Sequence, residues 1–208
     1  MKLGPVLRRA FFERRCPVVA RDLVGCFLVR TLPDGTRLVG RLIEVEAYLG
    51  DGSDPASHCH RGPTPRNGSM FGPPGRLYAY RSYGIHTCVN VVCEPEGRGA
   101  GVLLRALEPV AGVETMCALR GLASDRRGRE VASGPGRLAQ ALDLRLEHDG
   151  LSLLRGPLRL RGRSSAGRRR VARGPRVGIS KGVELPYRFY EADHPWVSAG
   201  PRKGGPLS

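Results

Sequence analysis

The sequence predicts a domain that mixes helices with strands joined by tight turns, and three observations lead to this prediction. Residues 41–50 alternate in character with the period of a strand. Residues 77–93 contain two further alternating runs separated by a Tyr-Gly pair, which indicates a β-hairpin. Residues 113–122 and 136–144 look helical. At 208 residues, the chain is long enough for one domain with a substantial core.

The remaining elements follow in chain order. A helix is expected to begin near Pro17 and to run into a strand at residues 26–31. The turn at residues 33–35, Pro-Asp-Gly, then predicts a hairpin into the strand at 41–50. Residues 101–110 read as a mostly buried strand that carries one arginine. The two ends of the chain, 1–16 and 199–208, are expected to be frayed tails of a single domain that spans 1–208.

The strand at 41–50 is the first candidate for a functional element. Its alternation places Glu44, Glu46 and Tyr48 on one face and only apolar side chains on the other. Two carboxylates and a phenol on a rigid element could form a catalytic site. The same pattern also fits a solvated edge face, where acidic residues are common. The strand alone leaves both interpretations open.

The charge of the chain is the strongest bulk signal. The net charge is +15 with a pI near 10.6, from 34 basic and 19 acidic residues, and only Lys2, Lys181 and Lys203 among the basic residues are lysines. A compositional preference for arginine would explain part of this excess. Such a field nevertheless attracts polyanions, and the guanidinium fork matches phosphate well. Nucleic acid is therefore the expected partner.

Composition excludes several other classes. No apolar run approaches the ~18 residues of a membrane span, and the N-terminus lacks the apolar segment of a secretion signal. The six cysteines form no spaced framework, which indicates reduced thiols. We therefore expect a cytoplasmic protein without membrane association.

Residues 50–75 show no periodicity, and a connection this long in a compact domain usually has a function. The loop contains His58, Cys59 and His60, which could suggest zinc with Cys88 and Cys93 as further ligands. There is no CxxC pair and no helical HxxxH pair, so the spacing does not fit a zinc site. We expect no metal and no other cofactor.

Two residues outside the loop also stand out. Tyr83 lies at the predicted hairpin tip, where an exposed aromatic could wedge between base steps or could simply pack on its own hairpin. Arg105 lies within an apolar strand, and a buried cation is costly unless it is paired. Glu46 is the expected partner of Arg105.

Six motifs carry a resemblance to a known family. In order along the chain they are EVEAYLG, ASH, TPRNGSMF, GRLYAYRSYG, CVN and VLLRALEP, with weaker echoes in SGPGRLAQAL and RFYEADHPWVS. The chain resembles the alkyladenine (3-methyladenine) DNA glycosylases, most strongly over residues 21–109. An ordered set of six motifs is far more specific than any one of them.

The resemblance assigns roles by position. Glu46 matches the general base that activates water, and Arg105 matches the arginine that holds this water or the carboxylate. Glu44 matches no catalytic position and is expected to be structural. Tyr48, His58 and Tyr80 match the walls around a flipped base, and Tyr78 matches the residue that supports His58. Asn90 matches the pocket floor that rejects the exocyclic amine of guanine. Tyr83 matches the intercalating residue. His60 follows so closely that it competes for the role of His58.

The resemblance also implies a fold and an activity. The fold would be a single α+β domain with a curved, mostly antiparallel sheet, helices packed outside and a protruding β-hairpin. The activity would be that of a monofunctional base-excision-repair enzyme. Such an enzyme flips an alkylated or deaminated purine out of duplex DNA and hydrolyses its N-glycosidic bond, leaving an abasic site. The partner would be double-stranded DNA with damaged purines, and the protein a nucleoid-associated monomer.

Two other functions remain to be weighed. A non-catalytic basic nucleic-acid-binding module would use the tyrosines as a stacking platform, but it leaves a buried Arg105–Glu46 pair without a purpose. A carbohydrate hydrolase based on Glu44 and Glu46 fits poorly. Residues two apart on one strand face point the same way and cannot flank a sugar from opposite sides.

Overall fold

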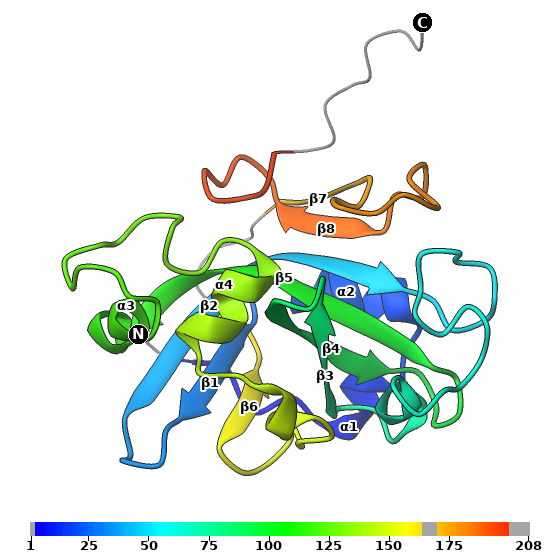
Figure 1. The fold of residues 1–208 in the computed structure, drawn as a ribbon, viewed down its shortest axis with the longest axis horizontal. Coiled ribbons are helices and arrows are strands. Elements are labelled where there is room, and N and C mark those ends of the chain that lie inside the picture. The colour runs from blue at the N-terminus through cyan, green and yellow to red at the C-terminus, as the bar shows by residue number, and fades with distance from the viewer. Residues whose placement is uncertain (1–2, 164–169, 200–208) are drawn as a thin grey trace, which may run out of the picture.

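The protein is described by a computed structural model that covers residues 3–163 and 170–199 (Figure 1). Its centre is an antiparallel sheet whose main order is β3-β4-β5-β2-β1-β6, with β7 and β8 attached through β2. The strands are β1 (Phe27–Thr31), β2 (Arg37–Tyr48), β3 (Leu77–Ser82), β4 (His86–Cys93), β5 (Ala100–Ala111), β6 (Leu158–Arg161), β7 (Val171–Gly174) and β8 (Arg188–Glu191). The expected single α+β domain with a curved, antiparallel sheet is confirmed.

The sheet is curled because β2 changes partners along its length. One edge of β2 pairs with β5 over residues 39–48, whereas the other edge pairs with β1 over residues 37–41 and with β8 over residues 44–46. β2 is therefore a central strand that is buried on both faces. This finding excludes the interpretation of residues 41–50 as a solvated edge.

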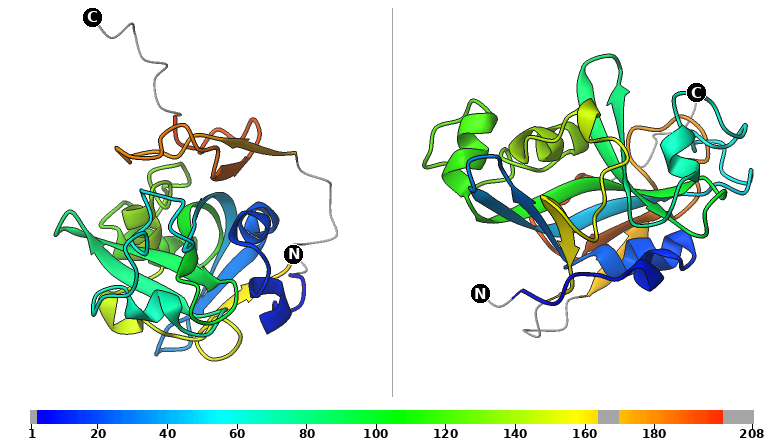
Figure 2. Two further views of the ribbon diagram at one scale, coloured as in Figure 1. Left: turned by 90° about the vertical axis from the view of Figure 1, so that its right-hand side faces the viewer. Right: turned by 90° about the horizontal axis from the view of Figure 1, so that it is seen from below.

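The helices lie on both sides of the sheet. They are α1 (Arg9–Phe12), α2 (Cys16–Leu23), α3 (Val113–Leu119) and α4 (Pro135–Ala141), with the short 3-10 helices η1 (Gly68–Phe71) and η2 (Leu146–His148). α2 packs on β2 and β5, and α4 packs on β4 and β5 from the opposite side, as Figure 2 shows. The helices confirm the expected helical stretches within a few residues at each end.

α2 illustrates how the sequence fixes this packing. A proline in its first turn has its backbone nitrogen where no helical hydrogen bond is needed. Cys16, Val19, Ala20 and Leu23 then recur at i, i+3, i+4 and i+7, and all four are fully buried.

The N-terminal segment corrects one expectation. Residues 3–16 are not a frayed tail, because Val6 bridges to Arg161 of β6 and α1 places a fully buried Phe12 in the core. The backbone amide of Glu94 donates to the Phe12 carbonyl at 2.8 Å. Residues 1–2 and 200–208 lie outside the described part of the chain.

The β3–β4 hairpin projects beyond the rest of the sheet (Figure 2). Its turn is closed by the amide of Ile85, which donates to the Ser82 carbonyl at 3.0 Å. Tyr83 and Gly84 have φ angles of 49° and 69°. Positive φ at both central positions is the hallmark of the type I′ turn, which matches the twist of the flanking strands.

Candidate active site

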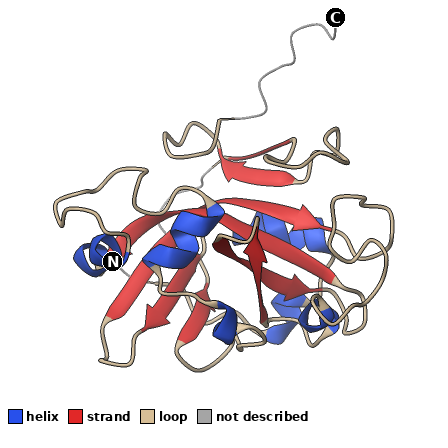
Figure 3. Ribbon diagram, viewed as in Figure 1, coloured by secondary structure: helices blue, strands red, loops and turns tan. Residues whose placement is uncertain are grey.

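A cavity of about 430 Å³ lies where β2, β5, the hairpin and two loops meet. One loop is the long connection between β2 and β3, drawn largely in tan in Figure 3, and the other follows β7. Every residue predicted for the site lines this cavity except Glu46. The lining residues are Tyr48, Ala56, His58, Arg66, Met70, Tyr78, Tyr80, Arg81, Ser82, Tyr83, Cys88, Asn90, Leu103, Arg105, Pro135, Val177, Gly178 and Ile179.

An irregularity in the sheet places Arg105 at the cavity. The register pairs Glu44 with Ala106 and Val45 with Leu104, so that Arg105 has no directly opposite residue in β2. Such a bulge re-aims the side chain of the extra residue. Arg105 consequently lies between two carboxylates, with its Nε 3.4 Å from Glu44 and its Nη1 3.4 Å from Glu46. The predicted Arg105–Glu46 pair is confirmed, and Glu44 shares it.

Glu46 lies behind the cavity wall and is fully buried. The Tyr48 hydroxyl donates to its Oε2 at 2.9 Å, and the backbone amide of Val177 donates to its Oε1 at 2.7 Å. Burial raises the pKa of Glu46, while Arg105 and the two hydrogen bonds oppose this rise. All three partners line the cavity, so the carboxylate lies directly next to it.

Glu44 is also fully buried, but apart from Arg105 its contacts are with the C-terminal part of the chain. Arg188 of β8 lies 3.2 Å from its Oε1, and the backbone amide of Ser198 donates to its Oε2 at 2.9 Å. These contacts connect the C-terminal segment to β2. Glu44 does not line the cavity, as expected for a structural residue.

The aromatic side chains form one wall. The rings of Tyr78 and Tyr80 are stacked at 5.4 Å, and the His58 ring stands edge-on to Tyr80 at 4.6 Å. His58 Nδ1 is 3.1 Å from the Tyr78 hydroxyl, so Tyr78 does support His58. Desolvation and the nearby Arg66 lower the pKa of His58, and burial raises the pKa of Tyr78 to about 12. Both rings are therefore neutral at pH 7.

The structure separates His58 from His60. Both side chains are exposed, but only His58 lines the cavity. Asn67 fixes this part of the loop, because its side-chain amide donates to the His58 carbonyl at 2.8 Å. Cys59 is buried against Met70. Among residues 3–163 and 170–199, no three His, Cys, Asp or Glu side chains are grouped so that they could hold a metal ion.

The two remaining predicted residues sit at opposite depths. Asn90 of β4 lines the cavity and is only 4% exposed. Tyr83 at the hairpin tip is 87% exposed, so it does not pack on its own hairpin. A left-handed backbone at a bulky residue costs roughly 1–2 kcal/mol, which indicates that something other than stability keeps a tyrosine there.

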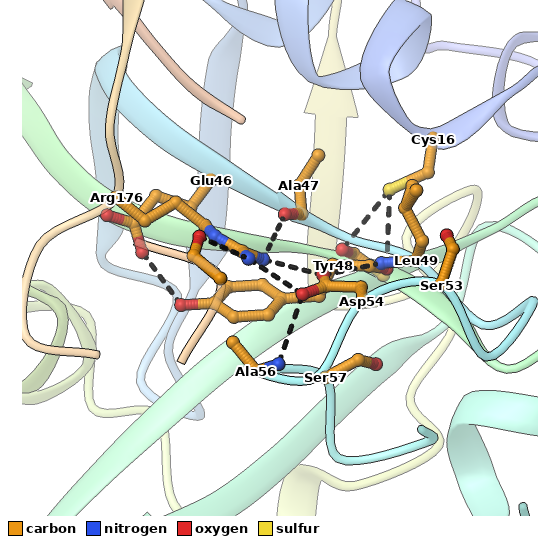
Figure 4. Close-up of polar contacts among 12 residues, drawn as sticks. Cys16, Glu46, Ala47, Tyr48, Leu49, Ser53, Asp54, Ala56, Ser57 and Arg176 are labelled. Atoms are coloured by element: carbon orange, nitrogen blue, oxygen red, sulfur yellow. Dashed lines mark hydrogen bonds and ion pairs between the residues drawn. The ribbon is translucent and has the colours of Figure 1, made fainter. Parts of the chain in front are cut away.

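Sequence analysis missed a fully buried ion pair next to the site. Arg176 donates through both terminal nitrogens to the carboxylate of Asp54, at 2.6 and 2.7 Å (Figure 4). Its guanidinium carbon lies 4.5 Å from the centre of the Tyr48 ring. One arginine in an arginine-rich chain and one aspartate in an aperiodic loop provide no signal that could have identified the pair.

Sequence comparisons identify the family of the chain. The family model described as methylpurine-DNA glycosylase matches residues 10–195. A relative from Rhodopseudomonas palustris (strain BisB18) is 49% identical over 91% of this chain and 88% of its own length. A relative from Methanoculleus marisnigri is 47% identical over 92% of this chain and 98% of its own length. Both bear the name "Putative 3-methyladenine DNA glycosylase". No helix in the described part of the chain is long and apolar enough to cross a membrane. The chain belongs to the methylpurine-DNA glycosylase family.

Proposed function

We propose that this protein is a monofunctional DNA glycosylase. It flips an alkylated or deaminated purine out of duplex DNA and hydrolyses the N-glycosidic bond with water, leaving an abasic site. The observation that carries this proposal is the buried carboxylate of Glu46, held by Arg105, Tyr48 and Val177 directly beside an aromatic-lined cavity. A base inside a duplex is out of reach, so such chemistry requires flipping.

The cavity suits a single flipped purine. Its volume of about 430 Å³ lies in the range of small-molecule sites. Tyr48 and the Tyr80–His58 wall offer aromatic surfaces, and a methylated purine that carries positive charge gains a cation–π contribution on such faces. A deaminated purine is neutral and gains instead from a hydrogen bond to His58. The buried Asn90 in the cavity lining would leave the exocyclic amine of guanine in a clash or unpaired, which penalises normal guanine.

Water activation is assigned to the polar groups around Glu46. Arg105 Nη1 donates to the Val177 carbonyl at 3.3 Å, so this carbonyl, the guanidinium and the Glu46 carboxylate face one point beside the cavity. A water held there would lose a proton to Glu46 as it attacks the sugar carbon. The carboxylate also stabilises the developing oxocarbenium charge. The purine leaves with the bonding electron pair.

A release assay tests the proposal. We expect the purified protein to release free methylated purine or hypoxanthine from duplex DNA in the presence of EDTA. The alternative, a non-catalytic binding module, predicts saturable DNA binding and no free base on any substrate. It also gives no reason for a carboxylate that remains buried at a cost in solvation.

Tyr83 is expected to hold the flipped state by filling the gap in the base stack. Unstacking costs a few kcal/mol and an inserted aromatic returns ~1–3 kcal/mol, so Tyr83→Ala should weaken the specific complex by about 10- to 100-fold. The loss should shrink for a mismatched lesion and for single-stranded DNA, where flipping costs little. Equal losses on matched, mismatched and single-stranded substrates would contradict this role.

The turn geometry supplies the control for this variant. Because Tyr83 is highly exposed and has a left-handed backbone, Tyr83→Gly should leave the thermal unfolding midpoint unchanged or raise it. The same variant should lose affinity as Tyr83→Ala does. A lower unfolding midpoint would show that the tyrosine packs structurally instead.

Affinity for undamaged duplex DNA is expected to fall steeply with salt. Each phosphate that an arginine neutralises contributes about −0.9 to the slope of log affinity against log salt concentration. With a net charge of +15, several such contacts are expected. Fluorescence anisotropy from about 50 to 200 mM salt measures the slope. A slope near zero would mean that the charge reflects composition alone.

A further inference from the structure

Arg176 lies behind the cavity rather than in it. It is among the largest fully buried side chains, and it does not line the cavity. Its partner Asp54 is also fully buried. The two terminal nitrogens of the Arg176 guanidinium each donate to one oxygen of the Asp54 carboxylate. Arg176 donates a further hydrogen bond to the Ala47 carbonyl of β2 at 3.0 Å.

This ion pair joins two loops that both contribute residues to the cavity lining. Asp54 belongs to the loop that carries His58, and it also accepts from the backbone amides of Leu49 and Ala56, each at 3.1 Å. Arg176 immediately precedes Val177, whose amide binds Glu46. The pair therefore connects the two loops through a single buried contact (Figure 4).

Tyr48 lies directly on this contact. The guanidinium of Arg176 is 4.5 Å from the centre of the Tyr48 ring, and the ring lines the cavity while Arg176 does not. Arg176 thus supports the ring from the side away from the cavity. The hydroxyl of the same ring donates to Glu46 at 2.9 Å. Arg176 therefore contacts the ring that carries this hydroxyl, and it is the sequence neighbour of Val177, whose amide is the other hydrogen-bond donor to Glu46.

Stability alone explains this arrangement poorly. Replacing a buried ion pair with apolar side chains of similar volume is often neutral or stabilising, because desolvation offsets the attraction between the charges. What such a pair supplies is a fixed geometry, since the planar fork fits the carboxylate in one orientation.

We propose that Arg176 is a positioning residue for the glycosidic reaction. Locked by Asp54, it holds the Tyr48 ring and the Val177 backbone against Glu46, so that the stacking face and the water-activating carboxylate are fixed relative to each other. This proposal rests on the proposed glycosylase function. Arg176 itself touches neither the flipped base nor the water.

The experiment compares Arg176→Met and Asp54→Asn with Arg41→Met. Arg41 is a matched control because it is another buried arginine that pairs with two carboxylates, Glu108 and Glu191, and it does not line the cavity. The first readout is hydrogen exchange at the Val177 amide under native conditions, which needs no activity. The second is the pH profile of single-turnover base release.

The proposal predicts a specific pattern. Arg176→Met and Asp54→Asn should each speed exchange at the Val177 amide by at least tenfold, relative to amides that exchange only through global unfolding. Arg41→Met should not change this ratio. Base release should fall by at least tenfold while affinity for undamaged DNA stays the same. The acid limb should move to higher pH, because burial and Glu44 raise the pKa of Glu46, and the Val177 hydrogen bond is one of the three influences, with Arg105 and Tyr48, that lower it.

Arg176→Lys separates geometry from charge. It keeps the cation but loses the fork, so it should restore neither the exchange rate nor the pH profile. Full rescue by lysine, or equal changes in Arg41→Met, would overturn the proposal. An inactive wild type that still shows the exchange pattern would refute the glycosylase function and retain the positioning of Val177. Unchanged exchange in an active enzyme would refute the positioning role alone.

Discussion

Glu46→Gln is expected to bind damaged duplex DNA as the wild type does and to release the base at least about 100-fold more slowly. Glutamine keeps the shape of the side chain, and its amide oxygen can still accept from the Val177 amide, while its NH2 group can donate to the Tyr48 hydroxyl. It cannot take the proton of the attacking water, and it offers no negative charge to the oxocarbenium-like sugar. Single-turnover release under saturating enzyme measures the effect on chemistry without interference from binding.

Glu44→Gln is the matched control for this variant. Glu44 is equally buried and shares Arg105, but it contacts Arg188 and Ser198 rather than the cavity. The Glu44→Gln variant should have a lower free energy of unfolding than the wild type but retain most of the base release. If both variants release base at the wild-type rate, water activation by Glu46 is wrong.

Arg105→Met is expected to change both stability and pH dependence. Removing the cation leaves Glu44 and Glu46 as neighbouring buried carboxylates, and breaking a buried pair in this way typically costs about 3–5 kcal/mol of unfolding free energy. Arg105 is also the main influence that lowers the pKa of Glu46 against burial. Without it the pKa rises further, so the carboxylate is ionised only at higher pH.

On acidification, Arg105→Met should therefore lose its activity at a higher pH than the wild type does. The acid limb of kcat/KM reports this shift, and urea unfolding reports the stability. Arg105→Lys keeps the charge and should move the limb less. An acid limb that stays in place or moves to lower pH in Arg105→Met would contradict the ionised role of Glu46.

The parts of this structure that sequence analysis predicted are governed by local rules. The alternation at residues 41–50 and the Tyr-Gly turn of the hairpin identified β2, β3 and β4, because strand period and turn geometry depend on neighbouring residues. The pairing of Arg105 with Glu46 was also predictable, since a cation in an apolar strand requires a partner. The site assignments came from ordered motifs, and in the structure those residues line one cavity, except for Glu46, which lies directly next to it.

The parts that were missed depend on contacts between distant segments. The Asp54–Arg176 pair joins residues 122 positions apart, and neither lies in a periodic element. The bulge that aims Arg105 is a property of the paired register, which no single strand encodes. The N-terminal segment was wrongly expected to fray because the burial of Phe12 depends on a contact near Glu94, far along the chain.

The most direct test of the account follows the products of one turnover on duplex DNA with a single methylated or hypoxanthine base. Hydrolysis by water predicts free base and an uncut strand that breaks only on treatment with alkali. It also predicts that borohydride traps no covalent protein–DNA adduct, because no amine of the protein attacks the sugar. A trapped adduct, or a strand cut without alkali, would contradict the water mechanism, and the absence of any free base would contradict the glycosylase function itself.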